Sequence, residues 1–178
     1  MARYAMAVDR RTCMGCASCA VACKVENRVG APFSRTQVVQ RLSGEFPELA
    51  LELFSVRCNQ CSAAPCVANC PTGASHYGAG GIVAIDTALC TGCKACLAAC
   101  PYDARFINDE GYAEKCDFCL HRIKQGLQPA CVATCPSRAL TFGDLDDRAS
   151  EISRLLASRR NHPLKPEAGT RPNVFYLE

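Results

Sequence analysis

The chain lacks tryptophan and is short of the large apolar side chains from which protein cores are normally built. Its 178 residues are 49 % hydrophobic, but that fraction includes 16 cysteines and 26 alanines. Only about a quarter of the chain is Val, Ile, Leu, Met, Phe or Tyr. A chain of this length forms one large domain or two small ones, and a single core of ordinary size is hard to build from this stock. We therefore expect the cysteines to stabilise the fold.

Other absences exclude whole classes of protein. No stretch approaches the roughly 18 uncharged apolar residues of a membrane span, and the first residues, MARYAMAVDRRTC, lack the apolar region of a cleavable signal peptide. The formal charge of +3 is too small to favour nucleic-acid binding, and there is no phosphate-binding Gly-rich motif with lysine. We expect a protein without direct membrane insertion, either cytoplasmic or held at a membrane by a partner, with which it could be exported.

The cysteines form four groups of four with none left over. The third group, CTGCKACLAACP, is a complete C-x2-C-x2-C-x3-C-P run, the bacterial ferredoxin signature for 4Fe–4S binding. The first group has Lys24 where proline is expected, and the second and fourth have longer gaps between their middle cysteines. The groups are Cys13, Cys16, Cys19 and Cys23; Cys58, Cys61, Cys66 and Cys70; Cys90, Cys93, Cys96 and Cys100; and Cys116, Cys119, Cys131 and Cys135.

This spacing suits a cubane cluster, which has four iron corners that each need one thiolate. Two-residue gaps let a tight loop reach three corners, and in two-cluster ferredoxins the fourth cysteine binds the neighbouring cluster. Gly15 and Gly92 allow strained backbone conformations inside such loops. Structural zinc sites more often use two separated C-x2-C pairs, and a disulfide framework needs an oxidising compartment. The sequence therefore predicts four 4Fe–4S clusters.

Two alternatives from other classes are a zinc-stabilised interaction module and an enzyme with a catalytic open-iron cluster. The enzyme would need a group that lacks one ligand, whereas 16 thiols match the 16 corners of four cubanes. Each oxidised cubane with four thiolates carries a charge of about −2, so four would bring the net charge of the loaded protein to about −5.

The four groups alternate between two types. The first and third share C-x-G-C-x-x-C-x-x-A-C, and the second and fourth share C-V-A-x-C-P. Groups could pair as neighbours, or the second with the third and the fourth with the first. The linker 70–90 resembles the hairpin between the two motifs of a bacterial ferredoxin, and the runs SRALTFGD and RYAMAVD at opposite chain ends would form the matching pair. This favours the second arrangement, although the linker 101–115 also resembles a hairpin.

We therefore predict an α+β fold of two bacterial-ferredoxin-like units, one inserted into the other, with short helices, hairpins and long connecting loops. The LELFSV run is expected to form a strand and residues 146–160 a helix that starts at Asp146 and Asp147. The VFYL run near the end is expected to pack on the protein's own core, and lysines and arginines beside the ligands to be mostly solvated. The expected parts are 1–23 with 101–145 for the outer unit, 24–57 for a linker, 58–100 for the inner unit, and 146–178 for the C-terminal helix and tail.

The sequence resembles the four-cluster electron-transfer subunits of the dimethyl-sulfoxide-reductase family of molybdenum or tungsten oxidoreductases, and the polysulfide reductase iron–sulfur subunit in particular. The small subunit of a soluble tungsten aldehyde oxidoreductase is a similar alternative, since no membrane anchor is visible before Glu178. Beyond the cysteines, the motifs that carry the resemblance are RYAMAVD, CPYDAR, KCDFCLHR, FGDLDD and GTRPNVFYL.

The resemblance implies a non-catalytic subunit that relays electrons between a molybdenum or tungsten pterin catalytic subunit and a membrane quinone-reactive subunit. In the family the clusters form a wire, with the first nearest the catalytic subunit. The implied ligand sets, in wire order, are Cys13, Cys16, Cys19 and Cys135; Cys23, Cys116, Cys119 and Cys131; Cys58, Cys61, Cys66 and Cys100; and Cys70, Cys90, Cys93 and Cys96.

Four complete ligand sets predict about 16 Fe and a similar amount of acid-labile sulfide per chain. Iron and sulfide analysis of anaerobically purified protein, with EPR spectroscopy of the reduced state, measures this load. Stoichiometric zinc with little sulfide would contradict the prediction and support the zinc module.

Overall fold

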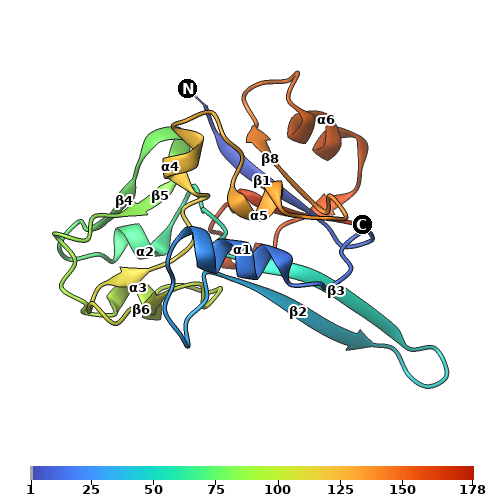
Figure 1. Ribbon diagram of the computed structural model, residues 1–178, viewed down its shortest axis with the longest axis horizontal. Coiled ribbons are helices and arrows are strands. Elements are labelled where there is room, and N and C mark those ends of the chain that lie inside the picture. Colours follow the sequence, from blue (N-terminus) through green and yellow to red (C-terminus); the bar gives the residue numbers. More distant parts are fainter. Residues whose placement is uncertain (1) are drawn as a thin grey trace.

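The computed structural model describes residues 2–178 and has the predicted α+β class (Figure 1). Short helices and small sheets alternate with long loops. The strands are β1 (Tyr4–Asp9), β2 (Thr36–Ser43), β3 (Ala50–Arg57), β4 (Ser75–Tyr77), β5 (Val83–Ile85), β6 (Phe106–Ile107), β7 (Ala113–Glu114), β8 (Leu140–Asp144), β9 (Asn161–His162) and β10 (Val174–Leu177). The helices are α1 (Ser18–Glu26), α2 (Pro65–Ala68), α3 (Ala95–Ala98), α4 (Leu120–Ile123), α5 (Ala130–Ala133) and α6 (Glu151–Ser158), with 3₁₀ turns at Ala79–Gly81 and Pro166–Ala168.

The largest sheet joins the two ends of the chain in the strand order β8-β1-β10-β9 (Figure 1). Strand β1 is antiparallel to β8, with Met6 opposite Phe142, and parallel to β10, with Met6 opposite Val174. The predicted pairing of RYAMAVD with SRALTFGD is therefore confirmed. The prediction that VFYL packs on the protein's own core is confirmed too, since Tyr176 and Leu177 are fully buried.

Proline controls the length of the helices that carry cysteines. In α2, α3 and α5 the helix has only four residues, and a Cys-Pro pair begins two residues after its end. Proline has no N–H for the helical hydrogen bond and disfavours helical conformation in the residue before it. Lys24 stands at the corresponding position of the first group, and α1 continues to Glu26 with nine residues. The departure of this group from the ferredoxin pattern therefore lengthens one helix.

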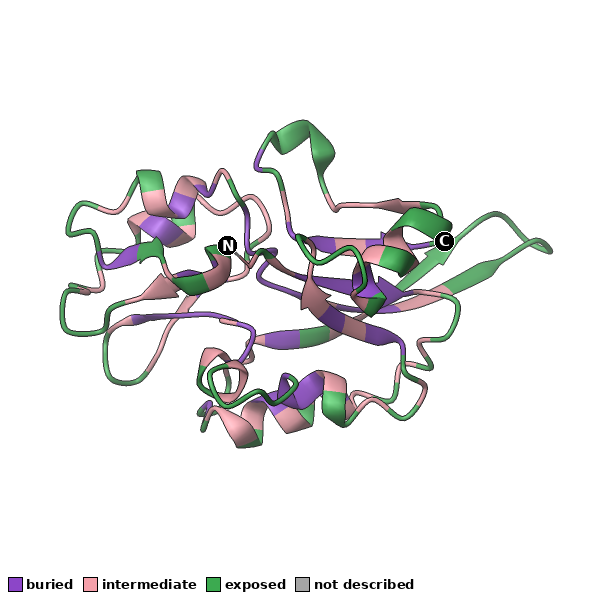
Figure 2. Cartoon of the chain, turned by 90° about the horizontal axis from the view of Figure 1, so that it is seen from above, coloured by how far each residue is buried: buried purple, intermediate pink, exposed green. Residues whose placement is uncertain are grey.

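The linkers between the cysteine groups are hairpins. Residues 70–90 contain the antiparallel pair β4–β5, and residues 101–115 contain β6–β7, so both predicted hairpins are present. The expected strand at LELFSV is β3. Its partner β2 was not predicted, because most of its side chains are exposed and its apolar residues do not alternate. Strands β2 and β3 make a long hairpin that projects from the body of the molecule (Figure 1), and its tip is exposed (Figure 2).

The C-terminal helix starts later than predicted. Helix α6 begins at Glu151, because the Ser150 hydroxyl accepts a hydrogen bond from the Ser153 amide (3.2 Å) and caps the helix. The Asp147 carboxylate instead accepts from the Ala149 amide within the preceding turn (2.8 Å). The predicted start at Asp146 and Asp147 was therefore wrong by about one turn of helix.

The buried side chains form three clusters, and two of them contain cysteines. The cluster beneath β1 and β8 includes Cys19, Cys58, Cys116 and Cys131. A second, beside α2 and α3, has Cys61, Cys66 and Cys96 among its six buried members. The third lies between β1 and α6 and consists of Ala5, Ala7, Ile152 and Leu177. Much of the interior is therefore formed by thiols, as the shortage of large apolar residues indicated.

Replacing Ile152 by alanine should destabilise the attachment of α6 to the sheet. Its side chain is fully buried and lies over Gly143, where an added Cβ would lie 3.0 Å from Ile152 Cγ2. We expect a loss of about 2 to 5 kcal/mol, which corresponds to a fall in melting temperature of roughly 4 to 20 °C. Thermal unfolding followed by circular dichroism measures this. The matched control, Val21→Ala on the exposed side of α1, should change the melting temperature little; equal effects would contradict this packing.

Candidate iron–sulfur cluster sites

The loop between the first two cysteines of each group has the same backbone turn. Its second residue is in the left-handed region in all four groups: Gly15 (φ 70°), Gln60 (φ 48°), Gly92 (φ 67°) and Phe118 (φ 58°). At Gly92 an added Cβ would lie 2.4 Å from the Gly111 carbonyl oxygen, so glycine is required there for space as well as conformation. The four C-x2-C pairs are thus presented by one repeated turn.

Two of these turns are left-handed without glycine, which no sequence pattern indicated. Gln60 and Phe118 are both almost completely buried. The Gln60 amide donates to the Cys116 carbonyl (2.6 Å) and accepts from the Val83 amide (2.7 Å). Burial and hydrogen bonding therefore offset the conformational cost, which is about 1 to 3 kcal/mol for such a residue.

The third and fourth cysteines lie four residues apart in every group, and a short helix carries the third cysteine each time. Residues separated by four positions lie on the same side of a helix, with their Cβ atoms roughly 5 to 6 Å apart. Such a pair can serve two neighbouring sites from a single short helix. The pairs are Cys19 with Cys23 at α1, Cys66 with Cys70 at α2, Cys96 with Cys100 at α3, and Cys131 with Cys135 at α5.

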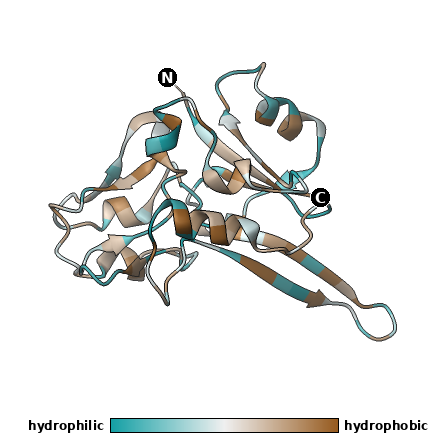
Figure 3. Ribbon diagram, in the orientation of Figure 1, coloured by the Kyte–Doolittle hydropathy of each residue, from teal (hydrophilic) through white to brown (hydrophobic). Residues whose placement is uncertain are grey.

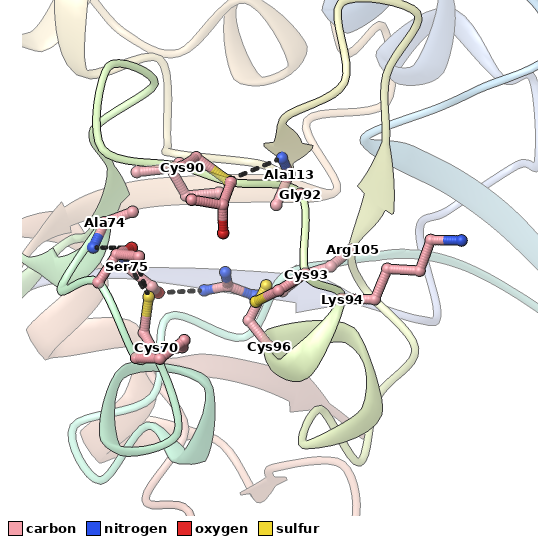
Figure 4. Close-up of a pocket in the computed structure, with 14 residues that line it drawn as sticks. Cys70, Ala74, Ser75, Cys90, Gly92, Cys93, Lys94, Cys96, Arg105 and Ala113 are labelled. Atoms are coloured by element: carbon pink, nitrogen blue, oxygen red, sulfur yellow. Dashed lines mark hydrogen bonds between the residues drawn. The ribbon is translucent and has the colours of Figure 1, made fainter.

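Two cavities are each lined by four cysteines. The first, which we call site I, is lined by Cys13, Cys16, Cys19 and Cys135, from opposite ends of the chain. The other, site IV, is lined by Cys70, Cys90, Cys93 and Cys96, and Figure 4 shows these residues around it. The two cavities are similar in size, which is expected if both accommodate the same group.

Three cysteines of the last group meet Cys23, and we call this set of four site II. The Asn27 amide lies 3.7 Å from Cys23 Sγ and 3.8 Å from Cys119 Sγ, so these two thiols are neighbours. Burial raises the pKa of Cys23 to about 11, and the charges of Cys131 and Cys119 add to this effect. Burial also raises the pKa of Cys116 far above its usual value, with Cys23 as the largest contributing charge. The thiols of site II are therefore close enough for the charge of one to raise the pKa of another.

The remaining four cysteines form site III in the same way. Burial raises the pKa of Cys61 to about 11, and the charges of Cys58, Cys66 and Cys100 raise it further. Protonated thiols must lose their protons to bind metal, so loading of these sites releases protons. The thiols found near one another at these four places are those that the resemblance placed together, and the ligand sets themselves stay a prediction.

The thiols of sites I and IV line a space instead of meeting at one point. Within residues 2–178, no three His, Cys, Asp or Glu side chains converge closely enough to hold a single metal ion. A cubane requires this arrangement, because each thiolate binds a different iron at the corner of a larger group. The residues present fit four 4Fe–4S clusters.

Three buried cations beside the sites were missed by the sequence analysis. Arg57 and Arg105 are 4 % and 5 % exposed, and each donates to a cysteine sulfur. Lys115 is one of four basic neighbours of which most were expected to be solvated, but it is 3 % exposed, and its ammonium group donates to the carbonyls of Val83 and Cys116. The other lysine and arginine neighbours of the ligands differ: Lys94 and Arg138 are exposed, and Lys24 is half-buried.

Known proteins match nearly the whole chain. Residues 49–145 match a family described as the 4Fe-4S dicluster domain. One subunit of the tetrathionate reductase of Salmonella typhimurium is 46 % identical over 98 % of this chain and 72 % of its own length. One component of the polysulfide reductase of Wolinella succinogenes is 41 % identical over 98 % of this chain and 94 % of its own length.

The chain therefore belongs to this family of iron–sulfur subunits. The arsenate respiratory reductase iron–sulfur subunit of a Shewanella strain is also 34 % identical, over 98 % of this chain and 96 % of its own length. All three relatives are named as components of reductases, and the third is named as an iron–sulfur subunit. The predicted cofactor class, the predicted role in electron transfer and the likeness to polysulfide reductase are therefore confirmed. No helix in the described part of the chain, residues 2–178, has the length and apolar character needed to cross a membrane.

Removing the clusters should unfold the cysteine-lined parts of the molecule first. The buried cluster beside α2 and α3 is half cysteine, whereas the cluster between β1 and α6 contains none. Since metal binding contributes folding free energy, we expect chelated protein to lose hydrogen-exchange protection over residues 58–115. Strands β1, β8 and β10 serve as the internal control and should keep more protection. Unchanged protection over 58–115 after complete iron removal would contradict the prediction.

Proposed function

We propose that the chain relays single electrons through sites I, II, III and IV, in that order, between a molybdenum or tungsten pterin catalytic subunit at site I and a membrane quinone-reactive subunit at site IV. The observation that carries this proposal is the exposure of the cysteines. Cys16 at site I and Cys93 at site IV are exposed, whereas every cysteine of sites II and III is buried or half-buried. Electrons would therefore enter and leave at the two ends.

Shared elements support the order of the sites. Helices α1 and α5 each hold a ligand of site I and a ligand of site II, within the helix or two residues after it, and they pack against each other. Helices α2 and α3 relate sites III and IV in the same way. The hydrogen bond from Gln60 to the Cys116 carbonyl joins the loops of sites III and II. Each pair of successive sites in the proposed order is therefore linked by a shared helix or by a hydrogen bond between their loops.

A 4Fe–4S cluster, when bound, accepts and releases one electron at a time. The chain's own residues hold its thiolates and donate hydrogen bonds to them. The Ser75 amide donates to Cys70 Sγ (3.3 Å) and the Ala113 amide to Cys90 Sγ (3.4 Å), both at site IV (Figure 4). Such bonds favour the more negative, reduced state and so raise the reduction potential.

The same ligand sets favour an inserted arrangement of two ferredoxin-like units. Sites III and IV draw all their ligands from residues 58–100, and sites I and II draw theirs from residues 13–23 and 116–135. We take 1–23 with 101–145 as the outer unit and 58–100 as the inner one. The segment 24–57 between them includes the β2–β3 hairpin, which exposes Leu42, Phe46 and Leu51. Figure 3 shows apolar stretches along both of its strands.

The relatives' names support a catalytic partner for this chain. They belong to tetrathionate, polysulfide and arsenate reductases, in which these proteins are named as components. In our proposal such a partner, or the membrane subunit, also holds this chain at a membrane. A soluble tungsten aldehyde oxidoreductase is the second candidate partner, and it would need no membrane subunit.

The grouping predicts that Cys135 and Cys16 affect one cluster. Replacing either by serine removes a ligand of site I and should alter or abolish the same EPR signal of the reduced protein. Cys93→Ser should alter a different signal, because it belongs to site IV. If Cys135→Ser instead changes the signal that Cys93 governs, the groups pair as neighbours along the chain and the proposed order is wrong.

The role predicts that the isolated chain exchanges electrons with artificial dyes but turns over no physiological substrate. In the assembled complex, Cys16→Ser should block electron flow while the catalytic partner keeps its own cofactor. Leu127→Ala changes an exposed side chain that lines neither cavity, so it is the control and should leave the flow near wild type. Dye-linked and substrate-linked assays measure these effects, and substrate turnover by the isolated chain would overturn the proposal.

A further inference from the structure

We propose that the buried cations Arg57, Lys115 and Arg105 are each shared by two successive cluster sites and raise the reduction potentials of both clusters. The inference rests on the proposed ligand sets. It assigns Arg57 to sites I and II, Lys115 to sites II and III, and Arg105 to sites III and IV, so that one cation lies at every step of the relay.

Arg57 bridges sites I and II. Its Nη1 donates to Cys131 Sγ of site II (3.3 Å). Its Nη2 donates to the Ser55 hydroxyl, which lies 3.4 Å from Cys19 Sγ of site I. A guanidinium keeps its charge even when it is buried, because it does not deprotonate in proteins. The group therefore stays charged between the two sites.

Arg105 bridges sites III and IV through a similar arrangement. Its Nη2 donates to Cys66 Sγ of site III (2.8 Å) and to the Ser75 hydroxyl (3.0 Å). The Ser75 amide in turn donates to Cys70 Sγ of site IV, and the guanidinium lines that cavity (Figure 4). In both bridges a serine thus extends the contact of an arginine to the second site.

Lys115 lies between the two inner sites. Its ammonium group donates to the carbonyl of Cys116, a ligand of site II (2.9 Å). It also donates to the carbonyl of Val83, whose own amide donates to the Gln60 side chain in the C-x2-C loop of site III. Lys115 directly precedes Cys116 just as Arg57 directly precedes Cys58, so the internal repeat places a cation at both positions.

No carboxylate among the described residues neutralises the charges of these three side chains. Within residues 2–178, none of the three forms an ion pair with a carboxylate. Buried Arg57 Nε, Arg105 Nε and Arg105 Nη1 have no hydrogen-bond partner among the described residues. A buried charge is costly unless an opposite charge lies nearby, and a cubane with four thiolates carries a charge of about −2. The loaded clusters would supply that opposite charge.

A fixed positive charge stabilises the reduced cluster more than the oxidised one, because the reduced cluster is more negative. Neutralising one cation should therefore lower the potentials of two clusters and leave the other two nearly unchanged. This pairwise pattern separates a specific charge effect from general loosening of the fold, which would affect all four clusters.

The test is a redox titration of the full chain with its clusters loaded, followed by EPR, with one Cys→Ser variant per site to assign the signals. Arg57→Gln should lower the potentials of sites I and II, Lys115→Gln those of sites II and III, and Arg105→Gln those of sites III and IV. Arg160→Gln removes the same charge from a side chain that is 85 % exposed and should shift none of them. Unshifted potentials, or an equal shift of all four, would overturn the inference.

A glutamine variant that fails to load its clusters can still be interpreted by comparison with a lysine variant at the same position. Arg57→Lys and Arg105→Lys change the shape of the side chain but keep its charge. Iron content at the wild-type level in the lysine variant but not in the glutamine variant would support the requirement for charge. If neither the lysine nor the glutamine variant loads its clusters, the inference is overturned, because loading would then depend on the shape of the side chain and not on its charge. Wild-type protein must first show four signals; fewer would refute the proposed ligand sets, whereas four signals that no variant shifts would refute only this inference.

Discussion

Four pairs of cysteines, each separated by four residues at a short helix, are the constraint on which the rest of the structure depends. The third cysteine of each pair lies in the helix and the fourth lies in it or two residues after it, so in the proposed ligand sets one element holds ligands of two neighbouring sites. The repeated left-handed turn presents the other two cysteines of each group. In the proposed ligand sets, sites I and II take ligands from residues near both ends of the chain, so those ends must meet. The sheet β8-β1-β10-β9 joins them.

The same constraint explains the unusual composition. Thiols occupy interior positions where a larger core would have aliphatic side chains, and four bound clusters would link segments that the small core alone holds weakly. They would also place negative charge inside the molecule, where Arg57, Lys115 and Arg105 are buried. Stability, ligand geometry and reduction potential would then be set by one group of residues.

Much of the site could be predicted from the sequence because cysteine spacing has a direct geometric meaning. The hairpins, the strand pair at the chain ends and the glycine turns at Gly15 and Gly92 followed from local patterns. Gln60 and Phe118 did not, because only tertiary contacts stabilise a left-handed turn without glycine. Lys115 was misjudged for a similar reason: a lysine is usually solvated, and its burial depends on carbonyl groups distant in the chain. The start of α6 was misplaced because two candidate caps lie close together in the sequence.

Anomalous diffraction at the iron edge, from crystals of the anaerobically purified protein, tests the central claim most directly. The account predicts four separate groups of iron positions, one inside each cysteine set, arranged in a single file from the exposed Cys16 to the exposed Cys93. Iron positions between cysteines of different sets, a set without iron, or single metal ions in place of clusters would contradict it.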